Sequence, residues 1–343
     1  MADDQEIRRQ ITDAIIAAEV KMEFSVCLHP TNTEEQKEKF LAEEIEEPIF
    51  TYKKSQLPPV SFPDFVVHSE IDALYRDRMG HTKGLALLLQ LVEQDREFSA
   101  LSQVLFPVKE IGNMPPEKEE SAEEPSIDAK EIVSAFREAL DTCEVQGWTV
   151  EVVDECSSRM FVNQWAKKVA VRADVHVTKE ELAALTRHEI GVHVLRAAHG
   201  ARQEEPLLSV GTLHGRLVEE GVACSIENTK AHRRIYERHL AVETALTHSF
   251  RETWQELCKS GCDADEAWTH TLRVKRGLTD GASRGAFTRD AVYAQGYEEI
   301  QQFVAGNGDM ASLLSAPIHP DEIELLTKEA NMQTFPLPVL LKQ

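Results

Sequence analysis

The chain contains 343 residues and carries a formal net charge of −22 at pH 7. This length is enough for one large domain or two domains of ordinary size, each with a core that needs no disulfide bonds. The negative charge argues against a nucleic-acid-binding protein, because contacts to phosphates need clustered lysines and arginines. No segment approaches the roughly 20 consecutive apolar residues of a membrane span, and the first residues do not resemble a secretory signal. We therefore expect a soluble, cytoplasmic protein that binds neither nucleic acid nor membrane.

The first third of the chain has mostly helical periodicity. Apolar spacing predicts helices at 5–24 and 33–46, then a proline-punctuated extended segment at 46–63, then two or three further helices up to about residue 106. We interpret residues 1–108 as a helical N-terminal region. Residues 109–128 contain three prolines and a run of glutamates with few large apolar side chains, which predicts an acidic linker or loop.

The second part of the chain changes period and then becomes helical again. A helix is expected from Asp128 to Val145, and almost everything beyond Thr178 reads as helix to about residue 330. Between them, alternation of apolar and polar residues predicts a small antiparallel sheet of strands at 148–155, 159–166 and 168–177. The predicted fold class is α+β and predominantly helical, with residues 129–343 as a second domain.

The stretch "TRHEIGVHVLRAAHG" (186–200) nearly matches the zinc-peptidase signature H-E-x-x-H, but one extra residue separates the histidines. In a regular helix, residues five apart diverge by about 140°, so His188 and His193 would not grip one ion. One widening of the helix to i→i+5 hydrogen bonding, a π-bulge, returns both imidazoles to one face. Gly191 lies between them and tolerates such a distortion. We therefore predict that the insertion modifies the metal site without abolishing it.

A catalytic zinc ion usually takes three protein ligands and keeps one position open for water. The helical segment "RLVEEGVACSIE" (216–227) supplies Glu219 and Glu220. Adjacent helical residues diverge by about 100°, so only one of the two faces the metal, and helix geometry alone leaves the choice open. Glu189, next to the first histidine, is the candidate general base that takes a proton from zinc-bound water.

Two less specific interpretations compete with a catalytic zinc. An H-E pair followed by a histidine arises by chance, and a buried histidine often only hydrogen-bonds to backbone. A binding protein in which zinc ties two helices together would need a closed set of ligands, and Cys224 lies four residues after Glu220. The pair "CKSGC" at 258–262 has no companion pair and is a weak zinc signal.

The sequence "HEIGVHVLRAAHGARQEEP" followed by "EEGVA" resembles the family of microtubule-associated tyrosine carboxypeptidases (MATCAP), whose motifs read H-E-I-G-T-H and E-E-G-L-A. The resemblance implies a gluzincin-like zinc metallopeptidase core in which His188, His193 and Glu220 hold Zn²⁺ and Glu189 is catalytic. Glu219 then has a supporting role.

Fainter matches extend over residues 30 to 305, including "SRMFVNQWAKKVAVRADVHVTKEEL", "VKRGLTD" and "FTRDAVYAQGY". Val192 and Val222 replace the usual Thr and Leu of the two motifs.

The implied activity is hydrolytic removal of a C-terminal residue, foremost Tyr, from a protein tail such as that of α-tubulin, and hence association with the cytoskeleton. That tail is strongly acidic, so the acid-rich segments 34–47 and 116–131 are expected to lie away from the cleft. A non-tubulin peptide or amide substrate is the alternative, and the oligomeric state is left open.

An exopeptidase of this kind needs a cation for the terminal carboxylate of its substrate, and the planar fork of arginine suits that group. The oxyanion of the reaction needs a hydrogen-bond donor, for which we favour Tyr293, followed by His232 and Tyr297. The candidate cations are Arg202, Lys275, Arg276, Arg284 and Arg289.

Overall fold

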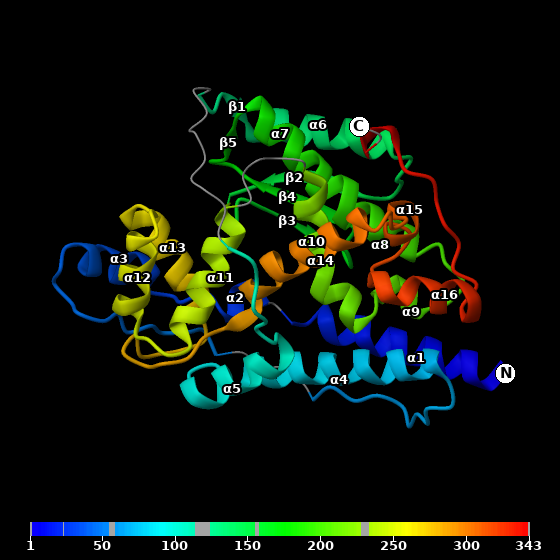
Figure 1. The fold of residues 1–343 in the computed structure, drawn as a ribbon, viewed down its shortest axis with the longest axis horizontal. Helices are drawn as coiled ribbons and strands as arrows, with labels where there is room; N and C mark the ends of the chain where they lie inside the picture. Colours follow the sequence, from blue (N-terminus) through cyan, green and yellow to red (C-terminus); the bar gives the residue numbers. More distant parts are fainter. Residues whose placement is uncertain are drawn as a thin grey trace.

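A computed structural model describes residues 2–22, 24–54, 59–113, 124–154, 158–227 and 233–341. Figure 1 shows a central pair of crossing helices, α10 and α14, with a layer of long helices (α1, α4 and α5) on one side and a small sheet with α6 and α7 on the other. Helices α11, α12 and α13 form a lobe at one end, with α3 against it. The predicted segment 114–123 of the linker and the candidate His232 lie outside the described residues.

The N-terminal helices are α1 (Ala2–Glu19), α2 (Phe24–Cys27), α3 (Thr33–Leu41), α4 (Glu70–Gln90) and α5 (Asp95–Leu105). Helix α4 begins at Ser69, whose hydroxyl accepts a hydrogen bond from the Asp72 amide, as an N-cap residue does. The predicted helix at 33–46 was too long. It ends at Leu41 because Glu43 adopts a positive φ of 59°, which an α-helix does not accommodate.

The N-terminal helices do not have a core separate from the rest of the described chain. Ile11 and Ile15 of α1 and Tyr75 of α4 are fully buried in the same apolar cluster as Val192 and Val218, which flank the motifs. The predicted regions 1–108 and 129–343 thus both contribute side chains to this cluster. Helix α4 contacts α10 of the second motif, and α1 contacts α4 and α9.

The small sheet follows helix α6 (Ala129–Thr142), which begins at Asp128 with a complete capping box, as the predicted helix start requires. Strands β2 (Thr149–Val153), β3 (Met160–Asn163) and β4 (Lys168–Arg172) are arranged in the order β2-β4-β3. The expectation of a purely antiparallel sheet was wrong, because β4 pairs antiparallel with β3 but parallel with β2. Alternation of side chains predicts a strand but not its neighbour. A separate antiparallel pair joins β1 (Ile127–Asp128) to β5 (His176–Val177).

The predicted helical character beyond Thr178 is confirmed in the described residues. The elements are α7 (Lys179–Leu185), a π-helix η1 (Thr186–Val194), α8 (Leu195–Gly200), α9 (Leu207–Val210), α10 (Leu213–Glu227), α11 (Arg233–Ala245), α12 (Phe250–Lys259), α13 (Ala264–Lys275), η2 (Thr288–Asp290), α14 (Ala291–Ala305), α15 (Met310–Leu313), η3 (Pro320–Glu322), α16 (Ile323–Glu329) and η4 (Val339–Leu341). None of the described helices is long and apolar enough to cross a membrane.

Helices α10 and α14 are in backbone contact where they cross. A Cβ atom added to Gly221 of α10 would lie 2.1 Å from the carbonyl carbon of Gly296 of α14. Only glycine permits this approach, so the glycine of "EEGVA" fixes how closely α14 lies beside Glu220.

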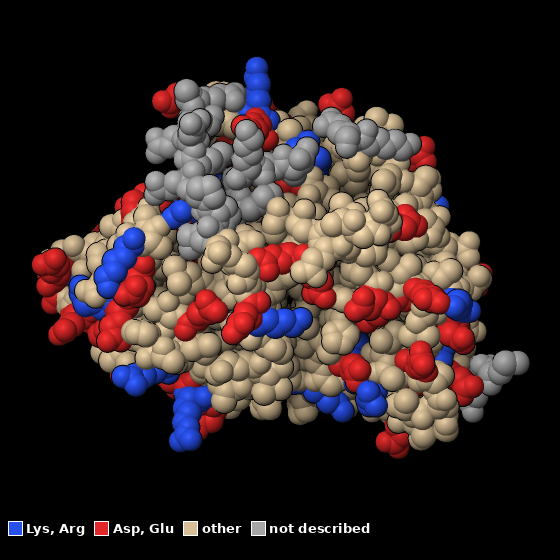
Figure 2. Space-filling view, in the orientation of Figure 1, with Lys and Arg blue, Asp and Glu red and all other residues tan. Residues whose placement is uncertain are grey.

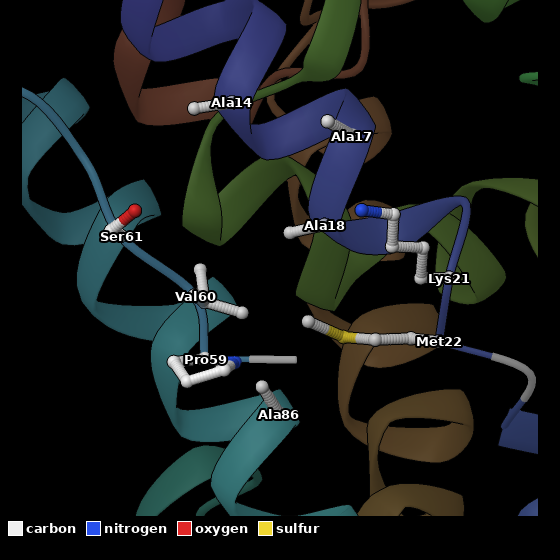
Figure 3. A pocket seen from close by; sticks show the side chains of 9 residues that line it. All are labelled: Ala14, Ala17, Ala18, Lys21, Met22, Pro59, Val60, Ser61 and Ala86. Atoms are coloured by element: carbon white, nitrogen blue, oxygen red, sulfur yellow. The ribbon is translucent and has the colours of Figure 1, made fainter. Parts of the chain in front are cut away.

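Acidic side chains are spread over the face of the molecule that Figure 2 shows, both at the end formed by α3, α12 and α13 and across the middle. The acid-rich segment 34–47 includes most of α3 at that end. A small pocket of about 200 Å³ opens between α1, the segment 59–61 and α4 (Figure 3). A larger hollow of about 870 Å³ is lined by Trp148, Trp165, His199 and Arg202. Neither hollow is lined by His188, His193 or Glu220.

Candidate metal centre

The first motif lies on one continuous helix that runs from α7 through η1 into α8. Thr178 caps it, accepting a hydrogen bond from the Glu181 amide at 3.1 Å while the Glu181 side chain accepts from the Thr178 amide. The nine residues from Thr186 to Val194 are π-helical, as the spacing of the histidines predicts. Both imidazoles consequently lie on one face, with 3.1 Å between their Nε2 atoms.

The carboxylate of Glu220 on α10 faces the two imidazoles. Its Oε2 atom lies 3.6 Å from His188 Nε2 and 3.7 Å from His193 Nε2. In a tetrahedral zinc site with bonds of about 2.0–2.1 Å, ligand atoms lie about 3.4 Å apart, so these three separations fit one ion. The two nitrogens and one oxygen are also a donor set that zinc prefers. The arrangement can hold a divalent cation while leaving a fourth position open.

Each imidazole has a second carboxylate on the ring nitrogen that faces away from the cluster. Glu227 Oε1 lies 2.5 Å from His188 Nδ1, and Glu219 Oε1 lies 3.1 Å from His193 Nδ1. Such contacts fix the tautomer and orientation of metal-binding histidines. Glu219 was expected from the sequence to have a supporting role, whereas Glu227 was not expected at the site. Its signal was available, because Glu227 follows Glu220 by seven residues, two turns along the same helical face.

A buried arginine holds Glu219 in place. Arg196 of α8 is 0% exposed and its Nη1 donates to Glu219 Oε2. Its Nε and Nη2 donate to the backbone carbonyls of Leu313, Ala316 and Ile318. Because each guanidinium nitrogen has an acceptor, Arg196 holds the Glu219 carboxylate in a fixed position from which it accepts from His193.

The carboxylates keep the imidazoles charged when no metal is present. Burial lowers the pKa of His193, but Glu219 and Glu220 outweigh burial and raise that pKa to about 9. Burial likewise opposes protonation of His188, yet Glu220 and Glu227 hold its pKa well above the usual range. For Glu220, burial raises the pKa, and the two histidines lower it well below its ordinary value. A cation bound here therefore displaces protons.

Glu189 lies beside this cluster. It is buried, with 8% of its surface exposed, and a carboxylate oxygen lies within 4.8 Å of a ring nitrogen of both His188 and His193. Its negative charge is one of the contributions that raise the pKa of His188. A carboxylate in this position is within reach of a water molecule that occupies the cluster.

Tyr293 projects from α14, one turn before the Gly296 crossing with α10. Burial, followed by the charge of Glu220, raises the pKa of Tyr293 above its usual value. The hydroxyl is therefore protonated at neutral pH and can donate a hydrogen bond. For Tyr297 the pKa is also raised, by burial and then by Cys224.

The predicted cations occupy very different environments. Lys275 is buried: it is 1% exposed and its Nζ donates to the carbonyls of Ala245, His248, Ser283 and Gly285. Arg202 is exposed, with its guanidinium carbon 4.4 Å from the centre of the Phe335 ring, and lines the larger hollow. Arg284 is exposed near Glu252 of α12. Of the five cations predicted from the sequence, Arg276 and Arg289 are the two that lie close to the start of α14.

Two further arginines near Tyr293 were not among the sequence-based candidates. Arg273 of α13 binds Asp290 with both Nε and Nη2, at 2.5 and 2.8 Å. Arg238 of α11 has its guanidinium carbon 4.7 Å from the centre of the Tyr293 ring. Their helices are remote from the motifs in sequence, so no local pattern indicated them.

Two cysteines lie near groups of possible ligands. Cys224 lies within 4.8 Å of ligand atoms of His188 and Glu227, but burial and then the charge of Glu227 raise the pKa of its thiol well above the ordinary value. Cys262, from the "CKSGC" pair, lies within 4.8 Å of Glu237 and His270, where Glu237 already pairs with Arg233 at 2.8 Å. Burial raises the pKa of Cys262 to about 12. Neutral thiols are poor metal ligands.

Two histidines on one helix, a carboxylate on the next helix and a buried glutamate beside the first histidine form the arrangement typical of gluzincin-type metal-dependent hydrolases. The sequence profile described as "Microtubule-associated tyrosine carboxypeptidase" matches residues 63–335. The chain therefore belongs to the microtubule-associated tyrosine carboxypeptidase family.

Individual relatives match over a shorter segment. Microtubule-associated tyrosine carboxypeptidase 1 of Homo sapiens is 34% identical over 128 residues, which is 35% of this chain and 27% of the relative. The putative tyrosine carboxypeptidase MATCAP2 of Mus musculus is 32% identical over 133 residues, which is 36% of this chain and 25% of the relative. The chain thus matches only about a quarter of the length of these relatives.

Proposed function

We propose that this protein is a zinc metallocarboxypeptidase that removes the C-terminal residue, foremost tyrosine, from a protein tail. The observation that carries the proposal is the meeting of His188 Nε2, His193 Nε2 and Glu220 Oε2 within 3.7 Å of one another. These three residues would hold Zn²⁺. When bound, the ion supplies a Lewis acid that polarises the scissile carbonyl and makes water more acidic.

The remaining steps belong to the side chains around the ion. Glu189 takes a proton from the attacking water and returns it to the leaving amine as the peptide C–N bond breaks. Tyr293, whose hydroxyl keeps its proton at neutral pH, donates to the oxyanion. Glu219 and Glu227 orient the imidazoles through their Nδ1 atoms.

Membership of the family supports a proposal for the substrate and for the location in the cell. The relatives are named as tyrosine carboxypeptidases, and the Homo sapiens relative as microtubule-associated. We therefore propose a protein tail such as that of α-tubulin as substrate, and a cytoplasmic, cytoskeleton-associated site of action. The acid-rich segment 34–47 lies with α3 in the lobe of α11, α12 and α13, at one end of the molecule, which is compatible with an acidic tail at the motif helices.

The test combines metal analysis with tyrosine release from tubulin. We expect about one zinc ion per chain and release of terminal tyrosine by the native protein. The Glu189→Gln variant should retain the metal and lose at least 10²-fold of the rate, the usual contribution of a general base. Turnover that survives Glu189→Gln would remove the catalytic assignment.

Two other outcomes distinguish the alternatives. Release from unrelated tyrosine-ended peptides or small amides, but not from tubulin, would assign the zinc chemistry to another substrate. Metal retained by the native protein with no hydrolysis of any of these would favour a zinc-stabilised binding protein. In that case Cys224→Ser should also lose the metal, because a closed site needs a fourth protein ligand.

A further inference from the structure

The start of α14 is surrounded by more positive charge than it can neutralise. Asp290 is 5% exposed and is bound by Arg273 through two hydrogen bonds. Burial alone would raise the pKa of Asp290, but Arg273, followed by Arg238 and Arg276, lowers that pKa far below its usual value. Three guanidinium groups thus lie near the buried carboxylate of Asp290, and Arg273 donates a hydrogen bond to each of its two oxygens.

Two of these arginines have buried donors without a partner. The Nε atoms of Arg238 and Arg276 are shielded from solvent and hydrogen-bond to nothing in the structure. No ion pair or hydrogen bond of Arg238 with a described side chain is present; its guanidinium instead lies over the ring of Tyr293. A buried guanidinium N–H without an acceptor is unfavourable, so a site of this kind favours a ligand that accepts hydrogen bonds and carries negative charge.

The position of Arg238 relative to the cluster selects it over Arg276. Arg238 contacts Tyr293, and the charge of Glu220 acts on Tyr293 directly. Arg238 also lowers the pKa of Cys224, which lies one turn after Glu220 on α10. The charges that act on Arg276 come instead from Arg273, Asp290, Tyr52 and Arg289, on the side of α13 that faces the N-terminal segment.

The chemistry of an exopeptidase substrate requires an anion at about this place. The terminal carboxylate follows the scissile carbonyl by one residue, which is about 3.8 Å of chain. Arg238 contacts Tyr293, which packs against the cluster containing Cys224, one turn after Glu220 on α10, so Arg238 is placed on the side of the motif helices where that carboxylate would lie. Arg202 and Arg284 lie over other elements.

We propose that Arg238, held against the face of Tyr293, binds the terminal carboxylate of the substrate and thereby restricts the enzyme to the last residue of a chain. The substrate class is a peptide with a free C-terminal carboxylate. Arg273 and Asp290 are positioning residues, because their mutual pairing leaves Arg238 unneutralised. This inference rests on the proposed function.

The experiment compares two synthetic acidic peptides that end in tyrosine, one with a free carboxylate and one with a C-terminal amide. Binding is measured by calorimetry with the zinc-loaded Glu189→Gln protein, so that it does not depend on turnover. We expect the free acid to bind about 10- to 100-fold more tightly, the range expected for one charged hydrogen-bonded contact. Adding Arg238→Gln should abolish that preference without loss of zinc, and Arg238→Lys should retain part of it.

The matched control is Arg284→Gln, which removes an exposed arginine near α12 and should leave the acid preference unchanged. A preference for the free acid that persists in Arg238→Gln would overturn the inference, even if the native protein hydrolyses the peptide. If the native protein hydrolyses nothing but the acid preference disappears with Arg238→Gln, the carboxylate site stands and the proposed function fails. Equal binding of both peptides to the parent protein would overturn the inference directly.

Discussion

Glu227 offers the sharpest test of the metal centre, because its carboxylate contacts the cluster only through His188. The distance of 2.5 Å between Glu227 Oε1 and His188 Nδ1 is that of a strong charge-assisted hydrogen bond. Both side chains are partly shielded, with 21% and 13% of their surfaces exposed. Replacement of such an outer partner lowers metal affinity by about 10- to 100-fold, or about 1.4–2.8 kcal/mol.

The change to make is Glu227→Gln, which keeps the size of the side chain and removes its charge. Zinc affinity is measured by competition with a chromophoric chelator, beside the thermal midpoint of unfolding of the metal-free protein. We expect zinc affinity to fall by about 10- to 100-fold. The thermal midpoint of the metal-free protein should change little, because Glu227 is not fully buried. Glu256→Gln, which removes an exposed carboxylate that pairs with Lys259 on α12, is the control. An unchanged zinc affinity in a folded Glu227→Gln protein would refute our account of how His188 is oriented.

Three further predictions concern the same helices. Glu219→Gln should destabilise the metal-free protein by about 3–5 kcal/mol in chemical denaturation, because it leaves the fully buried Arg196 without its anion; a loss below 1 kcal/mol would contradict this. Gly221→Ala should lower both the thermal midpoint of unfolding and the zinc occupancy, because the Cβ of the new alanine would lie 2.1 Å from the backbone of Gly296. Ala223→Gly on the same helix is the control and should leave the zinc occupancy unchanged. Zinc affinity should rise with pH, by about tenfold per pH unit for each proton that the metal displaces, up to the His193 pKa of about 9. The reason is that the raised pKa keeps the imidazole of the metal-free protein protonated at lower pH. A zinc affinity that is independent of pH between 6 and 8 would exclude proton displacement.

The π-helix could be predicted from sequence because its cause is local. His193 follows His188 by five positions, and helix geometry alone shows that only a widened turn brings both rings to one face. The choice between Glu219 and Glu220 was not local. It depends on how α10 is rotated towards η1, which the Gly221–Gly296 crossing and the Arg196 network determine. Resemblance to the family supplied that choice where helix periodicity did not.

Features that depend on distant partners were predicted poorly. Residues 148–177 show the alternation of strands, but the parallel pairing of β2 with β4 is a contact between segments that the pattern does not order. Lys275 was a candidate cation from the sequence, whereas in the structure its partners are four carbonyls from other segments. Arg238 and Arg273 were not candidates, since only the packing of α11 against α14 and of α13 against η2 brings them to the start of α14.

The enclosed ammonium of Lys275 has a practical consequence for studies of this protein in solution. Burial lowers its pKa to about 8, so a larger share of this amine is unprotonated at neutral pH than for an exposed lysine. Because four carbonyls and the surrounding chain shield it, labelling should be slow in the native protein and fast once α13 separates from the segment 283–285. Mass spectrometry of this one amine would therefore report local opening of that part of the molecule.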